Sequence, residues 1–120
     1  TALGIAPVLS REQLASAIAT VAEARLTDGI ISYVVAIVRA TRLSADISHG
    51  ASPRSAAMLA AAARARAALE GRDYVIPDDV KALALPTLRH RVVLSPAAEI
   101  DGRRVDDVVK SIVDAAEAPR

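Results

Sequence analysis

Residues 27–43 read TDGIISYVVAIVRATRL, with apolar side chains at helical spacing. Thr27 or Asp28 suits the cap of a helix that reaches about Leu43. Ile31 and Val35 widen the apolar arc, so we expect this helix to be buried on more than one side. It should then form the centre of a helical bundle, with one face made of Ile30, Val34, Ile37, Val38 and Thr41.

Helix-start signals lie on both sides of this segment. Residues 10–13, Ser-Arg-Glu-Gln, match a capping box and predict a helix from Ser10 to about Thr20. Downstream, Ser52 followed by Pro53 predicts a third helix, because proline at the first helical position needs no hydrogen-bond donor. This Ala-rich helix is expected to stop at Gly71, a residue type common just past helix ends.

The C-terminal half predicts two more helices. One begins at Pro77, and Pro86 should kink or split it. The other carries Val105, Val108, Val109, Ile112 and Val113 on one face. We expect residues 44–51 to form a polar break, residues 95–102 a loop, and residues 92–94 a small strand that pairs with residues 21–26. The sequence therefore predicts an all-α fold, a small bundle of about five helices with room for one minor two-stranded β pairing.

Composition excludes several classes of protein. The 120 residues are 52% hydrophobic but only 2% aromatic, so the core must consist of Leu, Ile, Val and Ala. Cysteine is absent, which rules out disulfides and thiolate metal sites and fits a reducing cytoplasm. The net charge of +1 argues against nucleic-acid binding, and no apolar stretch is long enough for membrane insertion. The missing initiator Met favours a fragment of a longer chain.

The chain lacks the parts of a self-sufficient enzyme. Its five glycines are isolated, and neither Lys81 nor Lys110 follows a glycine, so there is no phosphate-cradling loop. His49 and His90 have no second ligand at metal-binding spacing, so no metal site is expected. We therefore do not expect the fragment to be active alone.

Arg54 is the candidate binding residue. It falls in the first turn of the predicted third helix, where the amides and the helix dipole favour an anion. Its guanidinium adds a planar set of donors suited to phosphate oxygens. The alternative is that Arg54 is simply a solvated first-turn residue. The short approach through Gly50, Ser52 and Pro53 favours the binding role, because it holds the helix start rigidly.

Four motifs together resemble a known family. Residues 50–54, GASPR, resemble the sensor-2 motif of MoxR-type AAA+ ATPases. Upstream, YVVAIVRATR at 33–42 is similar to the helix that ends in Ala-Thr-Arg in that family. GRDYV at 71–75 with PDDVKAL at 77–83, and LRHR at 88–91, follow in the family's order, so the resemblance covers about residues 10–95. One position departs: Ile76 stands where a Thr commonly precedes the proline.

The resemblance implies a helical lid behind a P-loop ATPase core. Residues 1–9 would be a linker, 10–116 the lid domain and 117–120 a tail. Arg54 would be the sensor-2 residue that reads the γ-phosphate of ATP in its own or a neighbouring subunit, supported by Gly50, Ser52 and Pro53. The parent protein would use ATP and Mg²⁺ as a cytoplasmic, chaperone-like homo-hexamer with von Willebrand A domain partners. The fragment itself would bind no cofactor tightly.

Two other functions stay open on the residues alone. One is a free-standing helical protein-interaction module without ATPase activity, and the other is a small basic bundle that binds nucleic acid. The remaining arginines have structural explanations: Arg39 and Arg42 suit the negative end of the second helix or a partner contact, and Arg89 and Arg91 suit a solvated face or carboxylate pairs.

Overall fold

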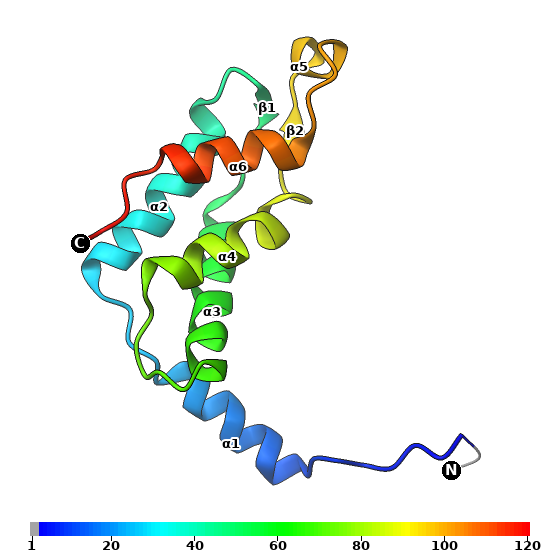
Figure 1. Cartoon of the computed structure of the whole chain (residues 1–120), viewed down its shortest axis with the longest axis vertical. Coiled ribbons are helices and arrows are strands. Elements are labelled where there is room, and N and C mark those ends of the chain that lie inside the picture. The colour runs from blue at the N-terminus through cyan, green and yellow to red at the C-terminus, as the bar shows by residue number, and fades with distance from the viewer. Residues whose placement is uncertain (1–2) are drawn as a thin grey trace.

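A computed structural model describes residues 3–120 as a helical bundle with one small β pairing (Figure 1). The helices are α1 (Arg11–Ala22), α2 (Asp28–Leu43), α3 (Pro53–Leu69), α4 (Pro77–Leu88), α5 (Pro96–Ile100) and α6 (Val105–Ala115). The strands are β1 (Ile47–His49) and β2 (Val93–Leu94). The predicted all-α class is confirmed, with one helix more than expected.

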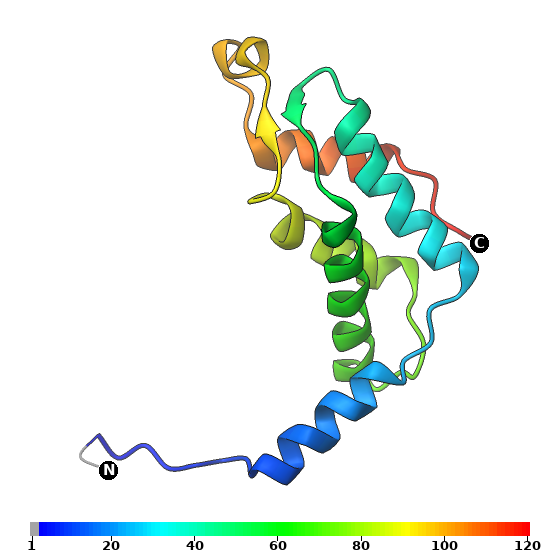
Figure 2. The ribbon, with the colours of Figure 1, turned by 180° about the vertical axis from the view of Figure 1, so that it is seen from behind.

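The core lies between α2, α3, α4 and α6. Its centre is aliphatic: Ile37, Leu59, Leu88 and Val109 are completely buried. Ala63, Ala67 and Ala84 are also fully buried, and their small side chains let α3 and α4 approach closely. Helix α1 has no buried residue and extends away from this bundle at the far end of α3 (Figures 1 and 2).

The predicted helix starts are confirmed. Ser10 and Gln13 form the reciprocal capping box, with Ser10 Oγ accepting from the Gln13 N–H at 3.1 Å. Thr27 Oγ1 accepts from the Ile30 N–H at 3.2 Å and caps α2. Each cap satisfies an amide that has no partner within its helix.

Helix α2 is buried on one face only. The predicted face of Ile30, Val34, Ile37, Val38 and Thr41 is buried as expected. Ile31 and Val35, however, are 46% and 42% exposed, so the expectation of burial on more than one side was wrong. The reason is positional, because α3, α4 and α6 contact α2 and the residues that are buried in α2 all lie on one helical face.

The β pairing uses a different partner from the one expected. Strand β2 pairs antiparallel with β1, with Ile47 opposite Leu94, inside the segment predicted to be a polar break. Residues 21 and 22 continue α1, and Arg25 makes only an isolated parallel bridge to Tyr74. Strand β1 follows α2 and β2 follows α4, and the packing of these helices brings β1, and not residues 21–26, next to β2.

One smaller expectation also needs correction, and a second is narrowed. The predicted loop at 95–102 contains the short helix α5, which starts after the Ser95 cap. Pro86 does not split α4, which continues to Leu88. The proline deprives only the Ala82 carbonyl of its helical partner, and Ala82 is exposed, so water can take the place of the lost donor.

Candidate functional site

Arg54 is the second residue of α3, at the end of the helix that adjoins β1 (Figure 1). The residue is exposed, and its side chain makes no hydrogen bond or ion pair with any residue in the range 3–120. Pro53 supplies no N–H, and the amide of a residue at this second position has no partner within its helix. A free guanidinium therefore lies beside the positive end of a 17-residue helix, an arrangement that suits an anion.

The segment that leads to Arg54 is held by the end of α2. The Ala51 N–H donates to Thr41 Oγ1 at 2.9 Å, and Arg42 Nε donates to the Ala51 carbonyl at 2.8 Å. Ala51 is completely buried, as is Thr41. Both polar groups of one buried peptide residue are thus bonded to two consecutive side chains of α2. This anchor is what the sequence reasoning missed, because it assigned Arg42 to the helix dipole or to a partner protein.

Gly50 lets the segment lie directly on α2. A Cβ at Gly50 would lie 2.7 Å from the backbone N and Cα of Arg42, closer than side-chain carbons are found in folded proteins. The φ angle of Gly50 is not the reason for glycine here, since the positive-φ glycines among the described residues are Gly4, Gly71 and Gly102. Close backbone approach therefore explains this member of the motif.

Ser52 and Pro53 start α3 as predicted. Ser52 takes the N-cap position and Pro53 the first helical position. The Ser52 hydroxyl lies 3.4 Å from both the N–H and the hydroxyl of Ser55, which is buried at 1% exposure. The structure thus brings the four site residues predicted from sequence into one short segment at the start of α3. Whether Arg54 contacts nucleotide stays a prediction.

A second cluster of motif residues forms a partly buried ion pair, in which the carboxylate is buried and the guanidinium is partly exposed. Arg72 donates through both terminal nitrogens to the two carboxylate oxygens of Asp79, each at 2.7 Å. Asp79 also accepts from the Ile76 N–H at 2.9 Å, and Arg66 Nε lies 3.4 Å from it. The sequence reasoning treated Asp79 only as a dipole partner. Asp79 stands at the third position of α4, where an acidic side chain can reach back to the N–H of the cap residue Ile76. This position could have indicated its role from the sequence.

The ion pair sets the protonation of Asp79. Hydrogen bonding to Arg72 lowers the pKa of the Asp79 carboxyl below its ordinary value of 3.8, and the bond from the Ile76 amide acts in the same direction against the effect of burial. The pKa of Arg72 is raised by the same contact. A carboxylate held ionised in this way connects the end of α3 to the start of α4. Its role is structural.

The other predicted arginines and histidines are peripheral. Arg89 pairs with Asp106 at 3.4 Å, one of the two roles expected for it, whereas Arg39 and Arg91 are exposed. His49 and His90 are exposed, and residues 3–120 hold no group of three potential metal ligands. No helix in the described part of the chain is both long and apolar enough to cross a bilayer.

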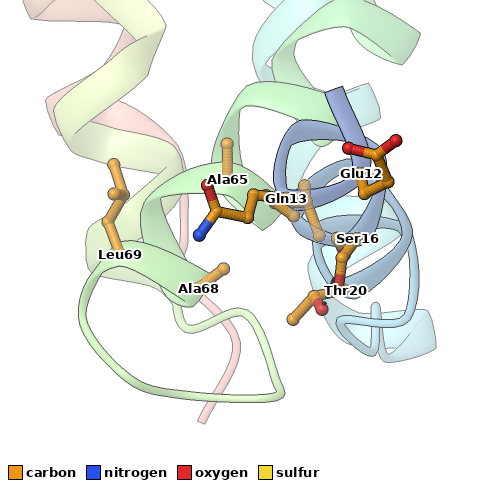
Figure 3. A pocket seen from close by; sticks show the side chains of 9 residues that line it. Glu12, Gln13, Ser16, Thr20, Ala65, Ala68 and Leu69 are labelled. Atoms are coloured by element: carbon orange, nitrogen blue, oxygen red, sulfur yellow. Dashed lines mark hydrogen bonds between the residues drawn. The ribbon is translucent and has the colours of Figure 1, made fainter. Parts of the chain in front are cut away.

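A broad hollow lies away from Arg54. It is a groove between α1 and the C-terminal end of α3, lined by Gln13, Ser16, Thr20, Ala65 and Ala68 (Figure 3). Glu12 is the only ionisable side chain in its lining. A groove with a single carboxylate and mostly small side chains carries no catalytic constellation.

The fold and these motifs agree with comparisons to known proteins. A family model described as an AAA lid domain matches residues 39–112, which is more than half of the chain and includes Arg54. The chain belongs to the AAA lid domain family. The matched region spans from the last turns of α2 to α6, and it contains both the anchor at Ala51 and the ion pair at Asp79.

Named relatives place this lid domain in the MoxR type of AAA+ ATPase. It is 40% identical over 113 residues to the uncharacterized protein YeaC of Bacillus subtilis, covering 94% of this chain and 35% of that one. It is 36% identical over 100 residues to the chaperone MoxR1 of Mycobacterium tuberculosis, covering 76% and 26%. The predicted family is thus confirmed. The lid domain spans only about a third or less of the length of these relatives.

The fold also matches a solved structure. A protein from Cytophaga hutchinsonii, assigned as an ATPase, superposes with a TM-score of 0.79 at 27% identity. The alignment covers 85% of the lid domain and 34% of that chain. The helical arrangement described above is therefore one that occurs as about one third of a larger protein.

Proposed function

We propose that this lid domain couples ATP binding and hydrolysis to its own movement in a MoxR-type AAA+ ATPase, with Arg54 as the residue that contacts the γ-phosphate. The P-loop core of the parent protein would supply most phosphate contacts and the Mg²⁺ site. The lid would contribute one mobile cation, in its own subunit or a neighbouring one. Because the core contacts are missing, the isolated domain is expected to bind ATP weakly.

One observation carries this proposal. Arg54 is exposed and unpaired among the described residues, although the segment in front of it is bonded through both polar groups of Ala51. A surface arginine with no function needs no such support. A fixed helix start limits the positions that the guanidinium can reach, and its free donors suit the oxygens of a phosphate group.

The decisive test is ATP hydrolysis by the full-length parent protein. Arg54→Ala should lower kcat by about tenfold to a thousandfold, about 1.4–4 kcal/mol of lost transition-state stabilisation. ATP binding should change much less, because the guanidinium is expected to act most strongly on the charge that develops in the transition state.

Arg104→Ala is a matched control for this test. Arg104 is also exposed and precedes a helix, where it occupies the N-cap of α6 without a side-chain hydrogen bond. Its loss should leave kcat unchanged. Normal hydrolysis by Arg54→Ala would contradict the sensor role and would favour the alternative, a helical interaction module.

The activity and assembly of the full-length protein are proposed from the same family membership. MoxR1 is named a chaperone, and we extend to this protein a role as a chaperone-like remodelling ATPase that assembles as a hexamer. Partners with von Willebrand A domains are part of that proposal. Size measurement of the full-length protein with ATP would test the assembly, and a stable monomer under those conditions would contradict it.

A further inference from the structure

Ala51 lies just before α3, and its backbone is hydrogen-bonded to two side chains of α2. We propose that Thr41 and Arg42 are positioning residues for Arg54, which fix the backbone from which its side chain extends by bonding both polar groups of Ala51. This inference rests on the proposed function, since it concerns how the sensor residue is held. It assigns a role to two side chains for which the sequence predicted other roles: Thr41 on the core face, and Arg42 at the helix dipole or in a partner contact.

The Thr41 hydroxyl can bond Ala51 in one way only. Thr41 Oγ1 donates its proton to the Val38 carbonyl at 2.6 Å, one turn earlier in α2. The same oxygen can therefore only accept from the Ala51 N–H, at 2.9 Å. Because Thr41 is completely buried, no water competes for either bond. The hydroxyl thus fixes the Ala51 amide at a definite point against α2.

Arg42 fixes the carbonyl group of the same residue. Its Nε donates to the Ala51 carbonyl at 2.8 Å, and this atom belongs to the rigid plane of the guanidinium. The amide and the carbonyl of Ala51 belong to the two peptide units that flank its Cα. Bonding both units restrains both backbone rotations at Ala51, which one hydrogen bond alone would not do.

The path from Ala51 to Arg54 is short and stiff. Only two residues intervene, of which Ser52 is the helix cap and Pro53 has its φ set by its ring. Gly50, on the other side, lies so close to the Arg42 backbone that the segment cannot move toward α2. A backbone rotation at Ala51 would therefore displace Arg54 by nearly its full extent. Misplacement of a catalytic group by about 1 Å can lower the rate by about a hundredfold.

The test uses ATP hydrolysis by the full-length protein. Thr41→Val keeps the shape of the side chain but removes the oxygen, and kcat should fall by about tenfold to a hundredfold with a smaller change in KM. Thr41→Ser restores the hydroxyl and should return kcat to within about threefold of wild type. Arg42→Lys keeps the charge without the Nε donor and should also lower kcat. This variant substitutes an exposed residue, so it provides the test if Thr41→Val does not fold.

A double-mutant cycle separates positioning from general structural damage. If Thr41 acts through Arg54, then adding Thr41→Val to Arg54→Ala should change kcat by less than about twofold, because nothing is left to position. Multiplicative effects of the two substitutions would overturn the inference. Circular dichroism of each variant checks that the helices are retained.

The result for Arg54→Ala alone distinguishes the two proposals. A drop in kcat for Arg54→Ala with normal kcat in Thr41→Val and Arg42→Lys would reject the positioning role and leave the sensor role standing. Unchanged kcat in Arg54→Ala would reject both. A drop in all three, with the non-additive cycle, would support both.

Discussion

Asp79 shows how much one side chain does in this small bundle. Its carboxylate receives two hydrogen bonds from Arg72 and one from the N–H of Ile76, the N-cap residue of α4, in a position with no solvent exposure. The ionised form is favoured only while these donors are present. When the chain unfolds, the carboxyl returns to its ordinary pKa, so folding and proton binding at this residue are linked.

The lowered pKa of Asp79 predicts an acid-sensitive stability. A group with a pKa lower in the folded state stabilises fully above its unfolded value of 3.8, and this contribution is lost as the pH falls through the lower folded value. The free energy of unfolding should therefore decline below about pH 4. Asp79→Asn should lower it by about 3 kcal/mol at pH 7 and make the acid decline shallower, as measured by urea unfolding across pH.

Asp78→Asn is the neighbouring control for that series. Asp78 is exposed and makes no ion pair among the described residues, so its variant should keep nearly the full stability and the steep acid decline. Equal acid sensitivity of Asp79→Asn and wild type would show that the buried pair does not control the acid limb.

At the scale of elements, α1 and α3 begin in the same way but are held very differently. Both have a serine cap, Ser10 in a complete capping box and Ser52 with proline after it. Helix α1 has no buried residue, whereas α3 buries Ser55, Leu59, Ala63 and Ala67. Local signals form both helices, but only α3 is stabilised by the core.

We predict that one cap substitution has a local effect and the other a global effect on stability. Ser10→Ala should fray α1 alone, with about fivefold faster amide exchange there and an unchanged unfolding midpoint of the chain. Ser52→Ala should lower the global free energy of unfolding by about 1 kcal/mol, because the α3 start belongs to the cooperative unit. Hydrogen exchange and urea unfolding measure the two effects. A global loss in Ser10→Ala would mean that α1 is part of the core unit.

On the scale of the whole molecule, the chain is more extended than a compact domain. Its radius of gyration is 17.1 Å, against about 14 Å for a compact chain of this length. The excess comes from α1 and the segment before it, which project from the bundle (Figure 2). This segment also exposes many large apolar side chains, among them Leu3, Val8, Leu14 and Ile18.

The bundle should therefore fold without α1. A shortened chain that begins at Glu23 should unfold cooperatively, with a free energy of unfolding within about 1 kcal/mol of the 120-residue chain. A chain that ends at Arg104 lacks α6, and with it the buried Val108, Val109 and Val113. That loss removes at least about 5 kcal/mol of apolar burial and should abolish the cooperative transition in thermal unfolding. Loss of folding in the first chain would contradict this division.

The sequence by itself determined the five longer helices and the family. Caps such as Ser10, Thr27 and Ser52 act on amides within three residues, and the apolar spacing of α2 and α6 is likewise local, so both can be read without coordinates. The motif around Arg54 was equally readable, because its members adjoin one another in the chain.

Only the tertiary structure decided which distant residues meet. The β1–β2 pairing, the exposed face of α2, the bond from Arg42 to Ala51 and the Arg72–Asp79 pair each depend on how the helices pack. Arg42 had two reasonable local roles, and its actual partner is set by the return of the chain through Gly50 against the α2 backbone. The spacing of residues in the sequence predicts the local hydrogen bonds of a helix. It does not predict the direction in which that helix packs, and the packing direction determines which distant residues come into contact.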